Sequence, residues 1–244
     1  MVEEGLLSSS GNDAFGPFAP TARPATVGHN QTLGDTFVRS LNELLEIREP
    51  AMALVEQWAR EAELPVEILP PSTSSGDVLV ELQVTTRSVL GAVAYGTGGI
   101  LIDGGWLRML GSGHPRLTRN IAAWNAERSN GFCLVADDAV GGFFALNGGA
   151  FGDDQGVVYY LAPDTLKWES LGIGHAAFTQ WAFTKRLHTF YDQMRWVGWE
   201  REVSNLPGDQ CFNFYPFLHT EQGSTQSSSR RPVPISEQYA LNTE

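Results

Sequence analysis

Residues 131–170 read GFCLVADDAVGGFFALNGGAFGDDQGVVYYLAPDTLKWES, and this segment decides the fold class. Four short apolar or alternating runs are separated by Asp-Asp, Asn-Gly-Gly, Asp-Asp-Gln-Gly and Pro-Asp. Short β-prone runs between such turn residues are typical of hairpins joined in series. We therefore expect an antiparallel β-meander with strands near 132–136, 142–146, 157–161 and 166–170.

The paired aspartates of this segment suggest a metal or acid–base site, and the geometry of a meander tests that idea. Consecutive turns lie at opposite ends of the sheet, and a five-residue strand spans roughly 17 Å. Asp137, Asp138 and Asp164 then lie at one end, whereas Asp153 and Asp154 lie at the other. We favour turn chemistry, because aspartate tolerates turn backbones and accepts hydrogen bonds from its own main chain. No metal site is expected, since the chain lacks a regular loop of oxygen ligands.

Helical and strand-like segments flank the meander on both sides. Upstream we expect helices over 37–45, with Asp35 as N-cap, and over 50–63, then a strand at 65–69 and a helix at 77–85. Two β runs at 91–95 and 99–102, an extended or helical piece at 106–110 and a short helix at 117–126 follow. Downstream, helical spacing from Gly174 to Met194 and over 198–206 precedes an aromatic strand at 211–218.

These elements predict an α+β fold, with N-terminal helices, a central antiparallel meander sheet and C-terminal helices packed on it. Residues 1–34 are rich in Gly, Ser, Pro, Ala and Thr and are expected to be a disordered leader. Residues 35–219 are expected to be a single α+β domain. Residues 220–244 are expected to be a polar linker and a short C-terminal segment.

The composition of the chain indicates which classes of partner it can bind. A formal charge of −12 over 244 residues opposes binding to nucleic acid and suits a basic protein partner. Glu3 and Glu4 stand where a secretory signal needs positive charge, and the longest near-apolar run, 89–102, is too short to span a bilayer. We expect a cytoplasmic protein without membrane contacts. Cys133 and Cys211 form no CxxC pair, which argues against structural zinc, and whether they lie close together stays open.

Catalytic motifs are absent from the sequence: it contains no GxSxG, HExxH or phosphate-binding glycine pattern. His175 and His188 are expected to have surface or helix-capping roles. Asp103 and Trp106 flank Gly104-Gly105, and a tight turn there would expose both side chains. We expect no catalytic residue and no cofactor. The candidate binding residues are Asp103, Trp106, His114, Asp137, Asp138 and Asp164.

Longer stretches carry a family resemblance. LQVTTRS, GGILIDGGWLRMLGSGHPRL, the meander, DQCFNFYPF and SRRPVPISE together closely resemble a bacterial family known only as a domain of unknown function. The resemblance covers about residues 41–237 and leaves out the leader.

The order of motifs within the meander also resembles the SUKH superfamily, the fold of a yeast cell-wall-synthesis regulator and of many bacterial toxin-immunity proteins. The matching motifs are ADD leading into GGFFAL at 136–146, GVVYY at 156–160 before Pro163-Asp164, and Trp168-Glu169 ahead of the helix bearing Phe178 and Trp181. The resemblance implies a protein-binding face without catalytic residues. The loop 147–156, the strand 211–218 and the C-terminal segment depart from the superfamily's pattern.

The sequence therefore leads to a hypothesis and its alternatives. The first is a non-catalytic, cytoplasmic protein-binding module of SUKH type, for example an immunity protein that binds a basic toxin domain. The alternative is a small-molecule-binding enzyme or sensor with a site near Asp103, Trp106, His114 and Asp137. A structural or assembly role, as a homodimer for instance, is the third, and the oligomeric state stays open.

Overall fold

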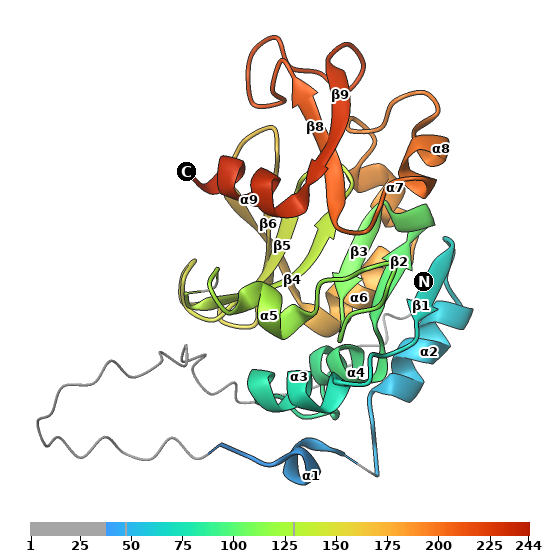
Figure 1. Cartoon of the computed structure of the whole chain (residues 1–244), viewed down its shortest axis with the longest axis vertical. Coiled ribbons are helices and arrows are strands. Elements are labelled where there is room, and N and C mark those ends of the chain that lie inside the picture. The colour runs from blue at the N-terminus through green and yellow to red at the C-terminus, as the bar shows by residue number, and fades with distance from the viewer. Residues whose placement is uncertain (1–37, 47, 129) are drawn as a thin grey trace, which may run out of the picture.

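A computed structural model describes residues 38–46, 48–128 and 130–244 (Figure 1). The expected leader and the N-cap at Asp35 lie outside the described residues. The described chain is an α+β fold, as expected. Its nine α-helices are α1 Leu41–Leu44, α2 Met52–Arg60, α3 Ser75–Leu82, α4 Val89–Gly96, α5 Ile121–Asn125, α6 His175–Ala182, α7 Arg186–Phe190, α8 Trp199–Ser204 and α9 Ile235–Thr243.

The central layer is a seven-stranded antiparallel sheet whose strands follow one another in sequence order. The expected meander is confirmed as its last four strands, and three more strands extend it on the N-terminal side. The strands are β1 Val66–Leu69, β2 Gly99–Ile102, β3 Leu107–Leu110, β4 Phe132–Asp138, β5 Phe143–Asn147, β6 Val157–Leu161 and β7 Trp168–Gly174.

Helices cover both faces of the sheet at β5. Adjacent residues of a strand point to opposite faces. The Phe144 ring lies 4.9 Å from that of Phe178 in α6, and the Phe143 ring lies 4.9 Å from that of Tyr239 in α9. The whole of β5 is consequently buried, which explains why its sequence is a continuous apolar run instead of an alternating one.

The prediction of a strand at 91–95 is wrong, because these residues belong to α4. The Ser88 hydroxyl accepts a hydrogen bond from the Gly91 N–H at 3.1 Å and caps the helix. Residues 89–94 are all buried, so the helix has no polar face to reveal its period. The helix expected at 77–85 is confirmed as α3, and 106–110 contains the strand β3.

Residues 220–244, expected to be a polar linker and a short C-terminal segment, contain a strand and a helix. Residues Ser229–Pro234 form β9, which pairs with β8, Gln210–Tyr215, along its whole length. Helix α9 follows and returns to the sheet, where Asn242 Nδ2 donates to the Gly141 carbonyl at 2.9 Å. The β8–β9 hairpin projects from the top of the molecule in Figure 1. The domain boundary at 219 stays a prediction.

None of the helices in the described ranges has the length and apolar character needed to cross a membrane.

Candidate functional site

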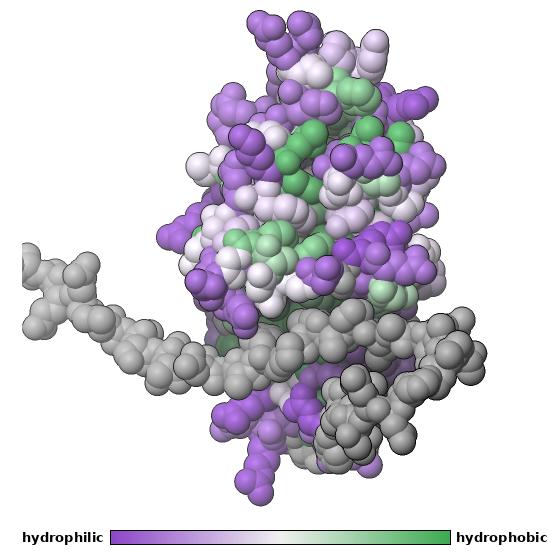
Figure 2. All heavy atoms as spheres, turned by 90° about the vertical axis from the view of Figure 1, so that its left-hand side faces the viewer, coloured by the Kyte–Doolittle hydropathy of each residue, from purple (hydrophilic) through white to green (hydrophobic). Residues whose placement is uncertain are grey.

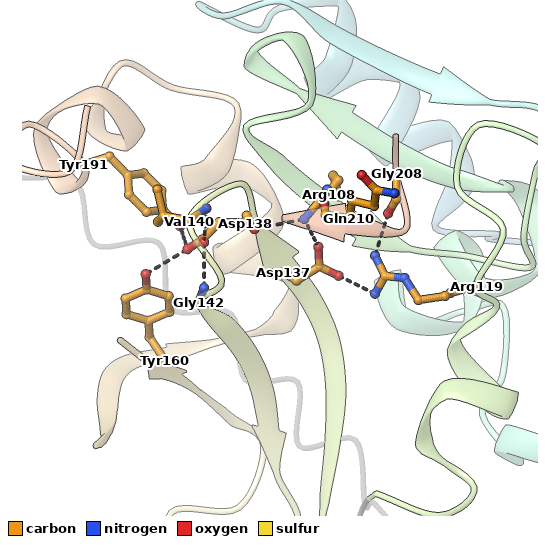
Figure 3. A network of polar contacts seen from close by, with 10 residues as sticks. All are labelled: Arg108, Arg119, Asp137, Asp138, Val140, Gly142, Tyr160, Tyr191, Gly208 and Gln210. Atoms are coloured by element: carbon orange, nitrogen blue, oxygen red, sulfur yellow. Dashed lines mark hydrogen bonds and ion pairs between the residues drawn. The ribbon is translucent and has the colours of Figure 1, made fainter. Parts of the chain in front are cut away.

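Asp137 and Asp138 lie at the end of β4, and both are fully buried (Figure 3). Asp137 was expected in a turn; it stands instead in the ladder opposite Arg108 of β3. Its carboxylate lies between two guanidinium groups, with Oδ1 2.6 Å from Arg108 Nη2 and Oδ2 2.5 Å from Arg119 Nη1. A buried carboxylate needs paired charge, which Arg108 of the neighbouring strand and Arg119 from the segment before α5 supply.

The two arginines continue the network to the C-terminal part of the chain. Arg119 Nη2 donates to the Gly208 carbonyl at 2.8 Å, and Arg108 Nη1 donates to the Gln210 carbonyl. Arg108 Nη2 also donates to the Asp138 carbonyl at 2.9 Å. Asp137 thereby fastens the first residues of β8 to the central sheet.

The turn chemistry expected for Asp138 is confirmed, and the carboxylate also accepts hydrogen bonds from two tyrosines. Its Oδ1 accepts from the backbone N–H groups of Val140 (3.0 Å) and Gly142 (2.7 Å). Its Oδ2 accepts from the hydroxyls of Tyr160 and Tyr191, each at 2.8 Å. Burial raises the pKa of Asp138, and the hydrogen bonds that it accepts oppose the rise. Burial also raises the pKa of both tyrosines.

The network stabilises the fold and offers no reactive group to solvent. Each oxygen of Asp138 accepts two hydrogen bonds, and both Asp137 oxygens are ion-paired. Asp153 and Asp154 lie in the β5–β6 loop, at the other end of β5, as expected. There, Asp154 accepts from Tyr159 Oη at 2.8 Å and from Asn147 Nδ2 at 2.8 Å. The four aspartates do not share a site.

The turn at 103–106 faces inward, contrary to expectation. Trp106 is fully buried and Asp103 is 9% exposed. Asp103 has a φ of 53°, and its Oδ2 accepts from His188 Nε2 at 2.9 Å and from Arg195 Nη2 at 2.5 Å. Arg195 in turn lies over the rings of Trp106 and Trp199, at 4.8 and 4.1 Å. His188 of α7 and Arg195 in the segment after α7 therefore cover the turn at 103–106. The sequence spacing gave no signal that these distant residues would meet.

His114 and His175 lie in different surroundings. His114 lies beside Gly98, which precedes β2, whereas Asp103 follows β2, so a four-residue strand of about 13 Å separates them. The predicted grouping of His114 with Asp103 and Trp106 is therefore not formed. His175 was expected to have a surface or helix-capping role; it is the first residue of α6 but is buried, and burial lowers its pKa from 6.5 to about 4. No group in the described ranges bonds to its Nδ1.

A narrow, largely apolar cleft lies between the β8–β9 hairpin, the segment after β8 and α9. The volume inside it that a water molecule can occupy is about 10 Å³, so it is a shallow feature of the surface. Figure 2, which views the molecule from the side of α9, shows apolar residues gathered in the upper part of this face among hydrophilic ones. The lining residues are Val140, Pro163, Phe212, Asn213, Phe214, Phe217, Leu218, His219, Gln238, Leu241 and Asn242.

Two of the sequence candidates bear on this cleft. Asp164 follows Pro163, a lining residue, and is exposed in the β6–β7 turn. Asp138 organises the β4–β5 turn that contributes Val140. Sequence reasoning missed the cleft because it assigned no helix or strand to residues 220–244, which it took for a polar linker and a short C-terminal segment. A signal was present, since Ile235, Gln238, Tyr239 and Asn242 have helical spacing.

The side chains most often used to hold metal ions are scattered in the described ranges. These ranges contain no group of three or more His, Cys, Asp or Glu side chains that could hold a metal ion. Cys133 and Cys211 are buried free thiols, and burial raises the pKa of Cys133 to about 12.

Comparisons with known proteins agree on a single family. The family described as "Protein of unknown function DUF2625" matches residues 41–238. The uncharacterised protein YbfG of Escherichia coli (strain K12) is 42% identical over 208 residues, which cover 84% of this chain and 95% of the relative. An uncharacterised protein of Haemophilus influenzae is 35% identical over 214 residues, which cover 84% of this chain and 94% of the relative. No solved structure matches the chain.

Proposed function

The chain belongs to the DUF2625 family of proteins of unknown function, and from this premise we propose that it is a non-catalytic, cytoplasmic protein-binding module of SUKH type, with toxin immunity as its specific role. The observation that carries the proposal is the cleft beside α9. Apolar side chains that stay accessible to solvent in a concave, polar-rimmed surface are typical of protein interaction sites.

The exposed apolar residues support a protein rather than a small molecule as the ligand. Leu241, which lines the cleft, is 41% exposed, and Tyr215, whose ring lies 6.2 Å from that of the lining residue Phe217, is 70% exposed. Both belong to elements that the ion pairs of Asp137 and the Asn242 hydrogen bond fasten to the sheet. A rigid apolar surface loses little conformational entropy when a partner binds.

The negative charge of the chain supports a basic protein as the partner. The formal charge of the chain is −12, and Asp164 stands exposed next to the cleft. A basic toxin domain would be attracted over a long range by the net charge, and its encounter rate would fall as salt increases.

A binding experiment with a matched pair of variants tests this proposal. The proteins encoded beside the gene are purified, and each is titrated into the full chain by calorimetry. We expect one basic protein to bind, and Leu241→Glu to weaken its binding at least about tenfold, because a carboxylate would enter the apolar contact. Leu54→Glu on α2 is the control, since Leu54 is also 41% exposed but lies away from the cleft.

Two results would contradict the proposal. One is that no neighbouring gene product binds; the other is that Leu241→Glu and Leu54→Glu have the same effect. The immunity role has a separate readout: co-expression of the chain must restore growth to cells that produce the bound protein, and Leu241→Glu must not.

A further inference from the structure

We propose that the outer edge of β7 accepts an extended, basic segment of a protein partner as an added strand of the central sheet. This goes beyond the proposed function, because no residue of β7 lines the cleft and pairing at β7 is tested separately. Two features of the molecule carry it: β7 is open where the other sheet edges are closed, and carboxylates flank it on both faces.

Strand β7 is the last strand of the seven-stranded sheet, and β6 is its one neighbour among the described strands. The direction of backbone hydrogen bonds alternates along a strand, so the registers determine which groups of β7 point outward. The Asp138 N–H donates to the Gly142 carbonyl at 3.0 Å, which makes these residues a hydrogen-bonded pair of β4 and β5. Alternation through the registers of β5 and β6 then directs the N–H and C=O of Glu169 towards β6. The same groups of Trp168 and Ser170 point away from the sheet.

These outward groups are available to a partner. Within the described part of the chain, no other backbone group bonds to the N–H or C=O of Trp168 or Ser170. Ser170 is exposed and Trp168 is half-buried, so solvent reaches this edge. An unpaired edge strand of this kind is a template for pairing with another chain.

The other edges of the described sheets are closed to pairing. Strand β1 has four residues and stands between Pro65 and Pro70. The Phe212 N–H donates to the Ala139 carbonyl at 2.8 Å, so β8 already bonds to the sheet on its outer side. Pro232 of β9 stands opposite Phe212 and therefore faces the outer edge of β9, where it offers no N–H. Strand β7 contains no proline.

A β-bulge limits the length of the added strand. The register of β6 and β7 shifts between Val157 and Tyr159, and Gly172 has a φ of 67°. Bulges twist an edge strand and interrupt its ladder. The regular part of the edge therefore ends at Ser170, and an added strand bonds to the outward groups of Trp168 and Ser170.

Carboxylates on both faces of this edge indicate a basic partner. Glu169 is exposed on one face of β7. Ser170 points to the opposite face, where its hydroxyl lies 3.5 Å from the exposed carboxylate of Asp154. Asp153 is exposed beside Asp154, so the carboxylates outnumber Lys167, the cation that precedes β7. Lysine or arginine side chains on either face of an added strand would therefore meet a negative charge.

Titration of short peptides into the isotope-labelled full chain tests the proposal by NMR. The probe is the capped hexapeptide Lys-Val-Lys-Val-Lys-Val, and its matched control has every backbone nitrogen methylated, which keeps the charges but removes the donors. We expect the amide resonances of Trp168 and Ser170 to shift. The methylated peptide should bind at least about tenfold more weakly, because it cannot donate to the outward carbonyl groups. The capped Glu-Val hexapeptide should not bind, because its carboxylates would face Asp154 and Glu169.

A pair of substitutions at one position separates backbone pairing from surface charge. Ser170→Pro removes the outward N–H, whereas Ser170→Ala keeps it, and both leave the carboxylates in place. Proline is tolerated on an edge strand where its nitrogen faces solvent. We expect Ser170→Pro to weaken binding of the Lys-Val peptide about tenfold and Ser170→Ala to change it by less than about twofold.

Four results would overturn the proposal: no binding of the Lys-Val peptide at millimolar concentration, equal affinity of its methylated form, equal binding of the Glu-Val peptide, or shifts confined to another surface. The peptides on the unaltered chain decide the matter even if Ser170→Pro fails to fold. If a basic partner binds in a manner sensitive to Leu241→Glu while the peptides do not pair with β7, the proposal for β7 fails and the proposed function stands. If the peptides pair with β7 and no neighbouring gene product binds, the proposed function fails.

Discussion

At the scale of single residues, the neighbouring Asp137 and Asp138 bind different partners. Asp137 is held by two arginines, whereas Asp138 is held by two tyrosines and two backbone N–H groups. The adjacent pair resembles a catalytic motif in the sequence, but alternation along β4 sends the two side chains to opposite faces of the sheet. Each then meets a different set of partners.

Removal of the Asp137 charge should destabilise the protein strongly. In Asp137→Asn, Arg108 and Arg119 stay buried without their counter-charge, and we expect the free energy of unfolding to fall by about 3–5 kcal/mol. Chemical denaturation measures it. Asp153→Asn at the exposed far end of the sheet is the control and should change stability by less than about 0.5 kcal/mol. Equal effects of the two changes would show that the buried network does not matter.

His175 should make stability depend on pH. Its pKa is about 4 in the folded chain and 6.5 when unperturbed, because burial disfavours the charged ring. The unfolded chain therefore binds the proton more readily, and stability is lost as the pH falls from 6.5 through 4. His175→Leu should reduce the loss between pH 7 and pH 4 by roughly 2–3 kcal/mol. A stability profile equally steep in His175→Leu and in the unaltered chain would refute the assignment.

At the scale of elements, α4 shows how packing reverses a local preference. Its apolar sequence suggested a strand at 91–95, but the residues form a helix, and Gly91 lets that helix approach the preceding loop closely. A Cβ on Gly91 would lie 2.1 Å from the Thr85 carbonyl oxygen. Helix propensity alone favours alanine over glycine and predicts that Gly91→Ala stabilises the protein. The close contact with Thr85 predicts that the same change destabilises it.

We expect Gly91→Ala to destabilise the protein by about 1–3 kcal/mol, because the backbone of residue 85 must move. Gly76→Ala in α3 is the matched control. The added Cβ there meets the flexible end of Leu41 at 2.9 Å, and the change should be neutral or stabilise by up to about 1 kcal/mol. Thermal denaturation of both variants decides the question; a stabilised Gly91→Ala would mean that the close approach is wrong.

At the scale of the whole molecule, the C-terminal elements complete the domain. Residue Ile235 of α9 is 1% exposed, and Tyr239 packs on Phe143 of β5. Strand β9 pairs with β8 and so provides hydrogen-bond partners for its backbone. The contact between Tyr239 and Phe143 joins residues about a hundred positions apart. They also build one side of the cleft to which the proposed function is assigned.

Removal of residues 220–244 should therefore lower the midpoint of thermal unfolding by roughly 10 °C or more, since several kcal/mol of packing and hydrogen bonding are lost. Removal of residues 1–34, the expected leader, is the comparison and should leave the midpoint unchanged. A chain ending at residue 219 that unfolds at the original midpoint would support the domain boundary predicted from the sequence.

The sequence by itself determined the meander, the flanking helices and the separation of the aspartate pairs, because strand period, turn residues and helical spacing are local properties. It also carried the resemblance to the family. Only the tertiary structure decided that Asp137 is ion-paired, that Asp103 and Trp106 face inward, that 91–95 is helical and that the C-terminal segment builds a cleft. Each of these depends on partners distant in the chain, such as Arg108 and Arg119 for Asp137 or Gly141 for Asn242, and local pattern contains no information about which distant groups will meet.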